Sequence, residues 1–235
     1  MRRKSKKSRP RGLRRRALRV GLWAAGLIAA FYVSCTVSLV LLRTLNPLVT
    51  GVQIQRRIEA ALSRDTTYEK RQTFVHLDEI PLHVRRAVIA AEDGSFYQHG
   101  GVDWAEILIV LGEYRESGRM RGASTISQQL VKNLFLTTHR NPVRKLLEYT
   151  LLPIAELILP KDRILELYLN IIEWGPGVYG VEAAAQYHYG VSVSALDRGR
   201  AARLAACIPA PRIWKPRRMD EYSAKILQRM RQRGW

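Results

Sequence analysis

Two adjacent acids stand where a predicted helix ends. Glu92 and Asp93 follow an apolar helical run and precede a glycine in the segment AAEDGSFYQHGG, residues 90 to 101. A carboxylate in the last turn of a helix costs roughly 0.3 to 1 kcal/mol, because the free carbonyl groups there carry partial negative charge. We expect the helix end and the neighbouring carboxylate to raise the pKa of Glu92 toward a value useful for abstracting a proton. His99 and Phe96 are expected to shape the same turn, with His99 as a hydrogen-bonding residue rather than a metal ligand.

A second group of polar residues recurs at helical spacing further along the chain. The stripe consists of Gln128, Gln129, Lys132 and Asn133, with Ser124 and Thr125 at its start. Such a stripe is commonly a solvated face, although solvated faces are usually rich in Glu and Lys. Amide and hydroxyl groups suit directional hydrogen bonds to a sugar, and a lysine supplies a point charge for phosphate.

A third group combines cations with one carboxylate. Arg144 and Lys145 lie one helical turn before Glu148, which is the spacing of a helical salt bridge worth about 0.2 to 0.5 kcal/mol. With Arg140 just before the helix, the same residues could instead hold a pyrophosphate. The glycine-rich segment WGPGVYG, residues 174 to 180, permits either close approach of a ligand or simple turns.

The elements that must position these groups are predicted to be helices. A chain of 235 residues that is 47% hydrophobic is long enough for one well-buried domain and an appendage. Apolar spacing predicts a helix over residues 104 to 117, and a capping box of Thr125 with Gln128 predicts the start of another. Asn141 before Pro142 predicts the start of a third helix, and Asp162 that of a fourth. Gly190 is predicted to end a fifth helix, and Ser194 to begin a sixth. Residues 44 to 72 are interpreted as a polar connection with some helical character. Only the segment TFVHL suggests a short extended piece, so the soluble part is predicted to be all-α.

The N-terminal region predicts a membrane anchor. Of the 39 Lys and Arg residues, eleven lie in residues 1 to 19, which contain no acid. Residues 20 to 42 contain no charged side chain, and a helix of that length reaches about 34 Å, enough for a hydrocarbon core of about 30 Å. The apolar core of a signal peptide would span only about 7 to 15 residues. We therefore expect a basic cytoplasmic tail (1–19) and an uncleaved transmembrane helix (20–42).

Charge also predicts orientation and partners. Cations stay on the cytoplasmic side, so the chain beyond the span is expected outside the inner face of the membrane. The basic tail abuts a span and lacks interleaved aromatic residues, which favours anionic lipid headgroups over nucleic acid as its partner. Cys35 and Cys207 lie too far apart for a predicted disulfide, and the sequence contains no CxxC metal motif.

Five segments carry a family resemblance. They are EDGSFYQHGG, GASTISQQLVKN, RKLLE, KDRILELYLNIIEWGPGVYGVEAAAQYHYG and LAACIPAP. In this order they resemble the successive motifs of the peptidoglycan glycosyltransferases, family 51, from about residue 74 to 212. The sequence contains no SxxK or KTG motif, so a penicillin-binding transpeptidase domain is not expected.

The resemblance implies a fold and a reaction. The fold would be mainly α and lysozyme-like, with a connector at 43–73 and a glycosyltransferase domain at 74–235 behind the single N-terminal span. The substrate would be lipid II, a disaccharide-pentapeptide on undecaprenyl pyrophosphate. The growing glycan chain would pass, with inversion, from undecaprenyl pyrophosphate to the GlcNAc 4-hydroxyl of lipid II during cell wall biogenesis. The domain would then lie in the periplasm at the cell inner membrane, where cell-wall synthesis or division proteins are possible partners.

The resemblance also implies residue roles. Glu92 would be the general base, and Glu148 would lie near the leaving pyrophosphate, where it would hold a divalent cation (Mg²⁺ or Mn²⁺) or position basic groups. Lys132 and Arg140 would bind phosphate. The donor cleft would be lined by Ser124, Gln128, Gln129 and Asn133. No organic cofactor is expected.

Two alternatives and one departure from the family pattern stay open. A lysozyme-like lytic enzyme would use similar carboxylates to activate water, and an inactive cell-wall scaffold would use none. The phosphate-binding cations argue against the first, and the intact glutamates argue against the second. Arg200 stands where the last motif usually has Glu, so we expect an altered stabilising contact there rather than lost activity.

Overall fold

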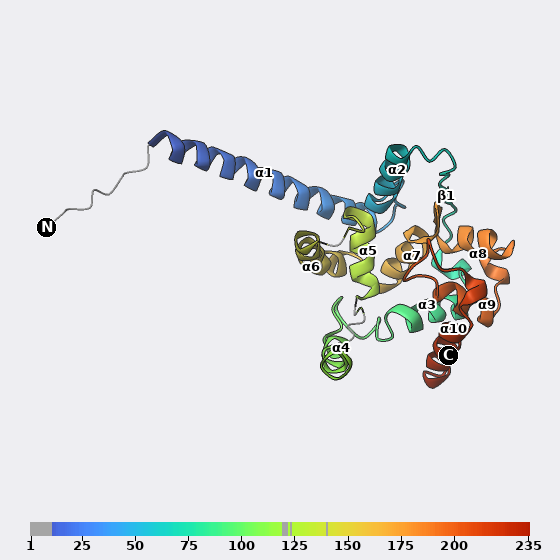
Figure 1. The fold of residues 1–235 in the computed structure, drawn as a ribbon. Helices are drawn as coiled ribbons and strands as arrows, with labels where there is room; N and C mark the ends of the chain where they lie inside the picture. The colour runs from blue at the N-terminus through green and yellow to red at the C-terminus, as the bar shows by residue number, and fades with distance from the viewer. Residues whose placement is uncertain (1–10, 119–121, 123, 140) are drawn as a thin grey trace.

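The molecule consists of one long N-terminal helix and a helical body. The structure is a computed structural model that describes residues 11–118, 122, 124–139 and 141–235. The long helix α1 (Arg11–Leu41) projects away from the body (Figure 1). The remaining helices gather at its C-terminal end. The prediction of a mainly α fold behind an N-terminal apolar helix is confirmed.

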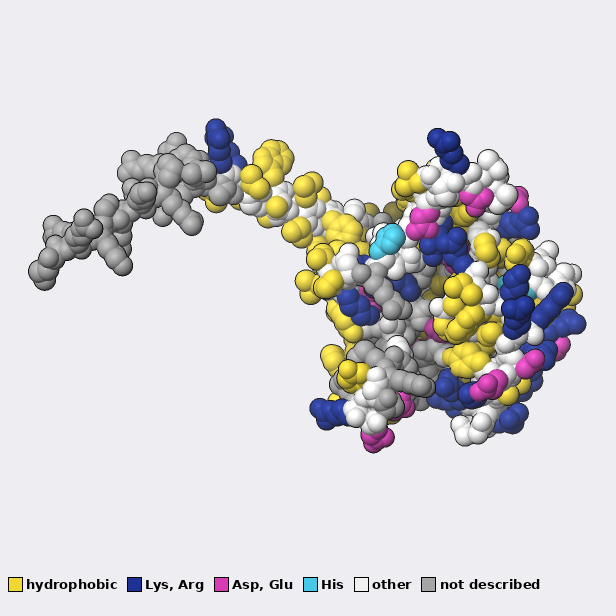
Figure 2. All heavy atoms as spheres, viewed as in Figure 1, with side chains coloured by type: hydrophobic (Ala, Val, Ile, Leu, Met, Phe, Trp, Pro, Cys, Tyr) yellow, Lys and Arg dark blue, Asp and Glu magenta, His cyan; other side chains and the backbone are white. Residues whose placement is uncertain are grey.

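Helix α1 has the length and composition of a membrane span. Leu18–Leu41 covers 24 residues with a mean hydropathy of 2.1, and most of its side chains are exposed. Apolar side chains cover the visible face of this helix, whereas Lys and Arg are spread over the visible face of the body (Figure 2). Exposed Leu, Val and Trp side chains are costly in water, so a single-pass membrane anchor accounts for this helix.

The C-terminal end of α1 is part of the body. Cys35, Leu39 and Leu42 are buried in the main core. The guanidinium of Arg163 donates to the carbonyl oxygens of Leu42 at 2.8 Å and Leu45 at 2.7 Å. Both carbonyls lie just beyond the last residue of α1, so Arg163 fastens the end of the anchor helix to the body.

The body contains two groups of helices. Its helices are α2 (Gly51–Ser63), α3 (Leu82–Glu92), α4 (Trp104–Ser117), α5 (Ile126–Phe135), α6 (Pro142–Ile158), α7 (Lys161–Ile171), α8 (Val181–Tyr189), α9 (Arg198–Ala205) and α10 (Asp220–Gln232). Helix α5 packs against α2, α6 and α7, while α3, α9 and α10 pack on one another. Large buried side chains such as Trp174, Tyr168 and Phe96 fill the core. The C-terminal end of α3 meets α5, because Asp93 accepts from the Ile126 N–H and Glu92 accepts from Gln129.

Several helix boundaries follow the sequence signals. The segment 104 to 117 is α4, and the capping box of Thr125 and Gln128 opens α5. Asn141 caps α6 with Pro142 as its first residue, and Gly190 ends α8 in the left-handed conformation. These signals were sufficient because each end is set by a local hydrogen bond or a local backbone conformation.

Two predicted helix starts are wrong. Helix α7 begins at Lys161, not Asp162, and Pro160 rather than a polar side chain precedes it. Ser194 lies within a short 3₁₀ turn, Val193–Ala195, that Ser192 caps. The next helix, α9, starts only at Arg198, because the Asp197 side chain accepts from the Arg200 N–H and serves as its cap.

A small sheet replaces the predicted extended piece. Strand β3 (Val178–Tyr179) lies between β1 (Arg71–Gln72), which is parallel to it, and β2 (Glu173–Gly175), which is antiparallel. The segment TFVHL forms no strand, because the Asn170 side chain bonds both the N–H and the C=O of Val75, each at 2.9 Å. The chain turns between β2 and β3 at Gly177, whose φ is +72°. A Cβ atom at this position would overlap the carbonyl oxygen of Glu69.

Candidate active site

Helix α3 ends at Glu92, as its sequence predicts. Val84, Ala87 and Val88 are buried and anchor one face of the helix. Asp93 is the C-cap residue, and its N–H donates to the carbonyl of Ile89 at 2.9 Å. The chain then turns away from the helix axis. The side chain of Glu92 therefore leaves the last helical turn, where it is half-buried.

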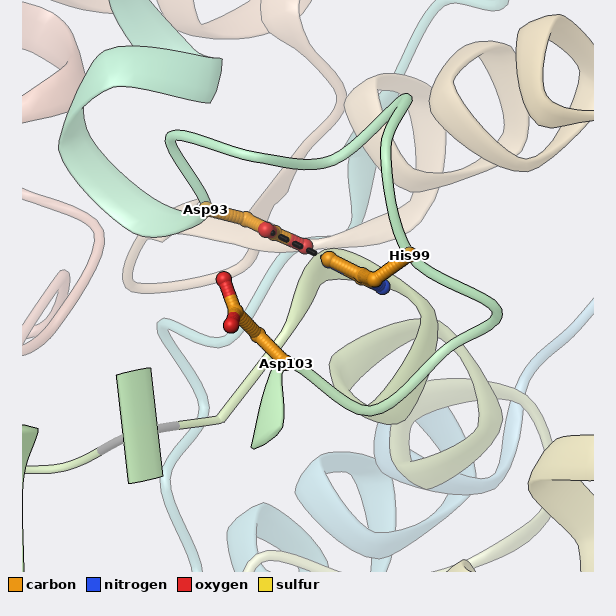
Figure 3. Close-up of side chains that lie close together, drawn as sticks. All are labelled: Asp93, His99 and Asp103. Atoms are coloured by element: carbon orange, nitrogen blue, oxygen red, sulfur yellow. Dashed lines mark hydrogen bonds and ion pairs between the residues drawn. The ribbon is translucent and has the colours of Figure 1, made fainter. Parts of the chain in front are cut away.

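The turn after Glu92 is fixed by three side chains, Asp93, His99 and Asp103 (Figure 3). His99 Nε2 lies 2.8 Å from Asp93 Oδ1, and His99 Nδ1 accepts from the Gly101 N–H at 3.0 Å. Because Nδ1 accepts, the neutral ring carries its proton on Nε2 and donates it to Asp93. The other Asp93 oxygen accepts from the N–H of Ile126 at 3.0 Å. Asp93 thus joins the turn to the start of α5.

These three residues form a hydrogen-bonded structural network. Their ligand-type atoms lie within 4.8 Å of one another, so the grouping has the size of a cation site. However, Asp103 accepts from the Ser95 hydroxyl and caps α4 through the N–H of Glu106 at 2.9 Å. Asp93 and His99 are equally engaged with one another and with the backbone. The expectation that His99 bonds within the turn is confirmed.

Glu92 is held by a chain of neutral groups. Gln129 Nε2 donates to Glu92 Oε2 at 2.6 Å, while the Tyr168 hydroxyl donates to Gln129 Oε1 at 3.1 Å. Tyr168 is fully buried in α7. Its hydroxyl therefore fixes the orientation of the Gln129 amide, so that the NH₂ group faces Glu92.

The pKa of Glu92 is raised above its ordinary value near 4.5. Desolvation is the largest cause, because burial penalises the ionised form. Asp93 raises this pKa further, whereas the Gln129 hydrogen bond and the positive charges of Lys132 and Arg229 lower it. The predicted direction of the shift is confirmed, but its main cause, burial, had not been anticipated.

A groove of about 380 Å³ lies beside Glu92. Its lining includes Ser124, Gln129, Lys132, Asn133 and Glu148, five residues that the sequence singled out. Glu92 lies against this lining through its bond to Gln129. The structure therefore brings the predicted base, polar stripe and carboxylate cluster together. Arg140 lies outside the described residues.

Gln128 has a different position from its neighbours in the stripe. It is 1% exposed, and its Oε1 accepts from the N–H of Thr125 at 3.0 Å in the capping box. Its Nε2 is buried and has no hydrogen-bond partner among the described residues. The same capping signal that predicted the start of α5 thus holds Gln128 at the base of the helix, away from the groove.

Glu148 lines the groove and is held between two cations. Glu148 is 2% exposed, and its two oxygens accept from Arg144 at 2.7 Å and from Lys145 at 2.5 Å. The helical ion pairs suggested by the spacing are present, but they lie in the groove rather than on a solvated surface. Each oxygen of Glu148 accepts from one cation in this arrangement, and a divalent cation (Mg²⁺ or Mn²⁺) at Glu148 stays a prediction.

Lys132 interacts electrostatically with both Glu92 and Glu148. Burial lowers the pKa of its ammonium group, and the nearby cations Arg144 and Lys145 lower it further. The negative charges of Glu148 and Glu92 oppose this effect. An additional anion in the groove would therefore favour the charged form of Lys132.

Three residues of the site had not been singled out from the sequence. Tyr168 orients Gln129, while Arg56 of α2 and Glu173 of β2 line the groove and form an ion pair at 3.0 Å. Tyr168 and Glu173 lie within the long fourth motif, whose polar residues between apolar positions were a usable signal. Arg56 lies in the connector, where no motif marked it.

Arg200 contacts Tyr189 and Asp197, and the expectation of a contact altered from the family pattern stays a prediction. Its guanidinium lies 5.6 Å from the centre of the Tyr189 ring, and its Nε lies 3.4 Å from Asp197 Oδ2. The side chain is 44% exposed, so this is a surface contact on α9. Arg200 lines neither of the two hollows described for this chain.

Comparison with known proteins assigns the chain to a family. The family model described as Transglycosylase matches residues 59–233. A protein named biosynthetic peptidoglycan transglycosylase from Ectopseudomonas mendocina is 43% identical over 228 residues, which cover 95% of this chain and 91% of the relative. Proteins of the same name from Stutzerimonas stutzeri and Nitrosospira multiformis are 44% and 43% identical, over 83% and 75% of this chain and 81% and 79% of the relatives. The chain belongs to the transglycosylase family of enzymes, as its five motifs indicated.

Proposed function

We propose that this enzyme polymerises peptidoglycan glycan chains from lipid II. The observation that carries the proposal is a carboxylate that resists ionisation, bonded to the lining of a groove that also contains a cluster of cations. Glu92 accepts from the lining residue Gln129, and Lys132, Arg144 and Lys145 line the groove. A base beside the groove suits a sugar hydroxyl, and the cations suit a diphosphate. The names of the relatives support the same substrate class.

The proposed reaction is a single displacement with inversion. Glu92 takes the proton of the GlcNAc 4-hydroxyl of lipid II as the hydroxyl oxygen bonds to C1 of the MurNAc at the end of the growing chain. The bond between C1 and the pyrophosphate oxygen breaks, and undecaprenyl pyrophosphate leaves with the electron pair. The α-linked donor becomes a β-1,4 linkage. A raised pKa makes Glu92 a stronger base than an ordinary carboxylate.

The cations act on the leaving group. Negative charge develops on the pyrophosphate as the bond to C1 breaks, and fixed cations in a water-poor groove stabilise that charge. Lys132 is half-buried, so the approach of a diphosphate stabilises its ammonium form. Glu148 keeps the guanidinium of Arg144 and the ammonium of Lys145 in place before the substrate arrives.

The anchor suits a substrate that stays in the membrane. The undecaprenyl tails of donor and acceptor remain in the bilayer, so an enzyme fixed to the same bilayer meets both. The excess of cations in residues 1–19 favours a cytoplasmic N-terminus and a body in the periplasm, at the cell inner membrane. Anionic lipid headgroups would hold the basic tail.

One experiment tests the proposal against the alternatives. The full-length protein in detergent is incubated with labelled lipid II and, separately, with preformed glycan, and Glu92→Gln is the comparison. The proposal expects polymer from the wild type and little from the variant. Shortened glycan would indicate a lytic enzyme, and no reaction with either substrate would indicate a scaffold.

A further inference from the structure

A second hollow adjoins the groove. It has a volume of about 470 Å³ and lies between the C-terminal half of α2, the segment before β1 and the turn from β2 to β3. Arg56 and Glu173 line both hollows, and their ion pair forms the partition between them. We call this second hollow the outer pocket. A branched substrate in the groove could extend a side arm past the partition into it.

The outer pocket differs from the groove in charge. Its lining contains four carboxylates and three guanidinium groups, from Glu59, Asp65, Glu69, Glu173, Arg56, Arg71 and Arg212. Tyr68 and Tyr187 add aromatic surface. A lining that mixes both signs suits a ligand with both an ammonium group and a carboxylate, whereas a diphosphate would meet repulsion from the four acids.

Glu173 provides a specific point of attachment. It is 7% exposed, and one oxygen accepts from Arg56 Nε at 3.0 Å. The other oxygen, Oε1, is buried and has no hydrogen-bond partner among the described residues, although the nearby backbone N–H of Gly177 lowers the pKa of this carboxylate. Arg212 Nε lies 3.9 Å away from Oε1, which is too far for a hydrogen bond. A buried carboxylate oxygen without a donor is costly, and a ligand N–H would satisfy it.

We propose that the outer pocket binds the peptide arm of the sugar substrate. An ammonium group of the peptide would donate to Glu173, and a peptide carboxylate would bind Arg71 and Arg212. Within the part of the chain that the structure describes, the ion pair of Arg71 is with the exposed Glu69, at 2.7 Å. About half of the Arg71 side chain is exposed, so it is available to a second carboxylate. The proposal rests on the proposed function, because the groove must hold the sugar that carries the peptide.

The test pairs protein variants with modified substrates. Polymerisation by the full-length protein is measured with intact lipid II, with lipid II acetylated at the peptide amine, and with lipid II amidated at the peptide carboxylates. Glu173→Gln is expected to raise the KM for intact lipid II about tenfold, the effect of losing one charged hydrogen bond, and to change the KM for the acetylated substrate less than about twofold. Arg71→Gln is expected to raise the KM for intact lipid II about tenfold and to change the KM for the amidated substrate less than about twofold.

The controls distinguish a binding role from a structural one. The double variant Arg203→Gln/Asp220→Asn removes a comparable exposed ion pair on α9 and α10 and is expected to leave all three KM values unchanged. Arg71 is half exposed, so its variant remains informative if Glu173→Gln does not fold. Equal KM increases for intact and modified substrates would overturn the peptide site alone. Absence of polymer from the wild type with every substrate would overturn the proposed function and this site together.

Discussion

Glu148, which lines the groove, and Glu92, which is bonded to its lining, have opposite electrostatic settings. Glu92 receives a hydrogen bond from a neutral amide at 2.6 Å, and burial raises its pKa. Glu148 lies between Arg144 and Lys145, with cationic nitrogens at 2.7 and 2.5 Å. A carboxylate that resists ionisation can take up a proton, whereas one held between two cations serves to fix positive charge. The contrast predicts that substituting Glu92 and substituting Glu148 affect activity and stability differently.

Removal of the Glu92 carboxylate is expected to have the largest effect. Glu92→Gln keeps the size of the side chain but removes the base, which should lower kcat by about 10² to 10⁴-fold. The rate of lipid II polymerisation measures this loss. The matched control is Glu221→Gln, because Glu221 is 88% exposed and pairs only with Lys225 among the described residues. Activity within tenfold of the wild type would show that Glu92 is not the base.

Removal of the Glu148 carboxylate is expected to affect stability and activity together. Glu148→Gln leaves Arg144 and Lys145 without their buried counter-charge. We expect the free energy of unfolding to fall by about 2 kcal/mol. This value is below the range for fully buried ion pairs because Lys145 is partly solvated. Urea unfolding measures the free energy. A lower kcat with unchanged stability would place Glu148 in the chemistry rather than in support of the cations.

Loss of the Tyr168 hydroxyl is expected to weaken the hold on Glu92. Tyr168→Phe frees the Gln129 amide to rotate, and the loss of one neutral hydrogen bond corresponds to about a five- to tenfold fall in kcat. Tyr189→Phe is the control, because among the residues that the structure describes its hydroxyl bonds the Arg200 carbonyl alone, at 3.3 Å, on the surface of α9. Equal effects of the two changes would contradict a specific role for Tyr168.

A change on α10 is expected to move the pH profile. Arg229 Nη1 donates to the Ala90 carbonyl in the last turn of α3 at 3.2 Å, and its charge lowers the pKa of Glu92. Other groups that act on this pKa are Gln129, Lys132 and Asp93. Arg229→Gln should therefore shift the acidic limb of kcat to higher pH, because Glu92 must be ionised to act as a base. Arg229→Lys should retain most of the wild-type profile, and identical limbs in all three proteins would refute the coupling.

The smallest expected effect is a gain in stability from Glu92→Gln. A raised pKa in the folded state means that the contribution of Glu92 to stability is complete below its unfolded value near 4.5 and is lost as pH rises through the folded value. At neutral pH the wild type should therefore unfold slightly more easily than Glu92→Gln. The difference should disappear below pH 4.5, and thermal unfolding at the two pH values checks it.

The sequence predicted the parts of the site that depend on local signals. Thr125 and Asn141 cap their helices through bonds within four residues, and Glu92 ends its helix as the apolar spacing indicated. Helical periodicity also placed Gln129, Lys132 and Asn133 on one face. It misplaced Gln128, because periodicity does not show that the capping box uses this side chain.

The remaining features depend on contacts between distant segments. The sheet pairs residues 71–72 with 178–179, and neither segment alternates over enough residues to mark a strand. The burial of Glu92 arises where α3 meets α5, and Tyr168 reaches Gln129 from α7 across 39 positions. Neither the composition of the chain nor the spacing of its residues predicts contacts between such distant segments. For the same reason Arg56 could not be connected with Glu173, which lies 117 positions further along the chain.

The fastening of α1 to Arg163 has a consequence for how the enzyme meets its substrates. Because Leu42 and Leu45 are tied to α7 and one face of the last turns of α1 is buried, an anchor formed by α1 would have no slack between a bilayer and the body. Under the proposed function, the search for the next substrate would then be confined to two dimensions, at one fixed depth. Inserting flexible residues after Leu45 should slow the encounter while leaving the bond-forming step intact.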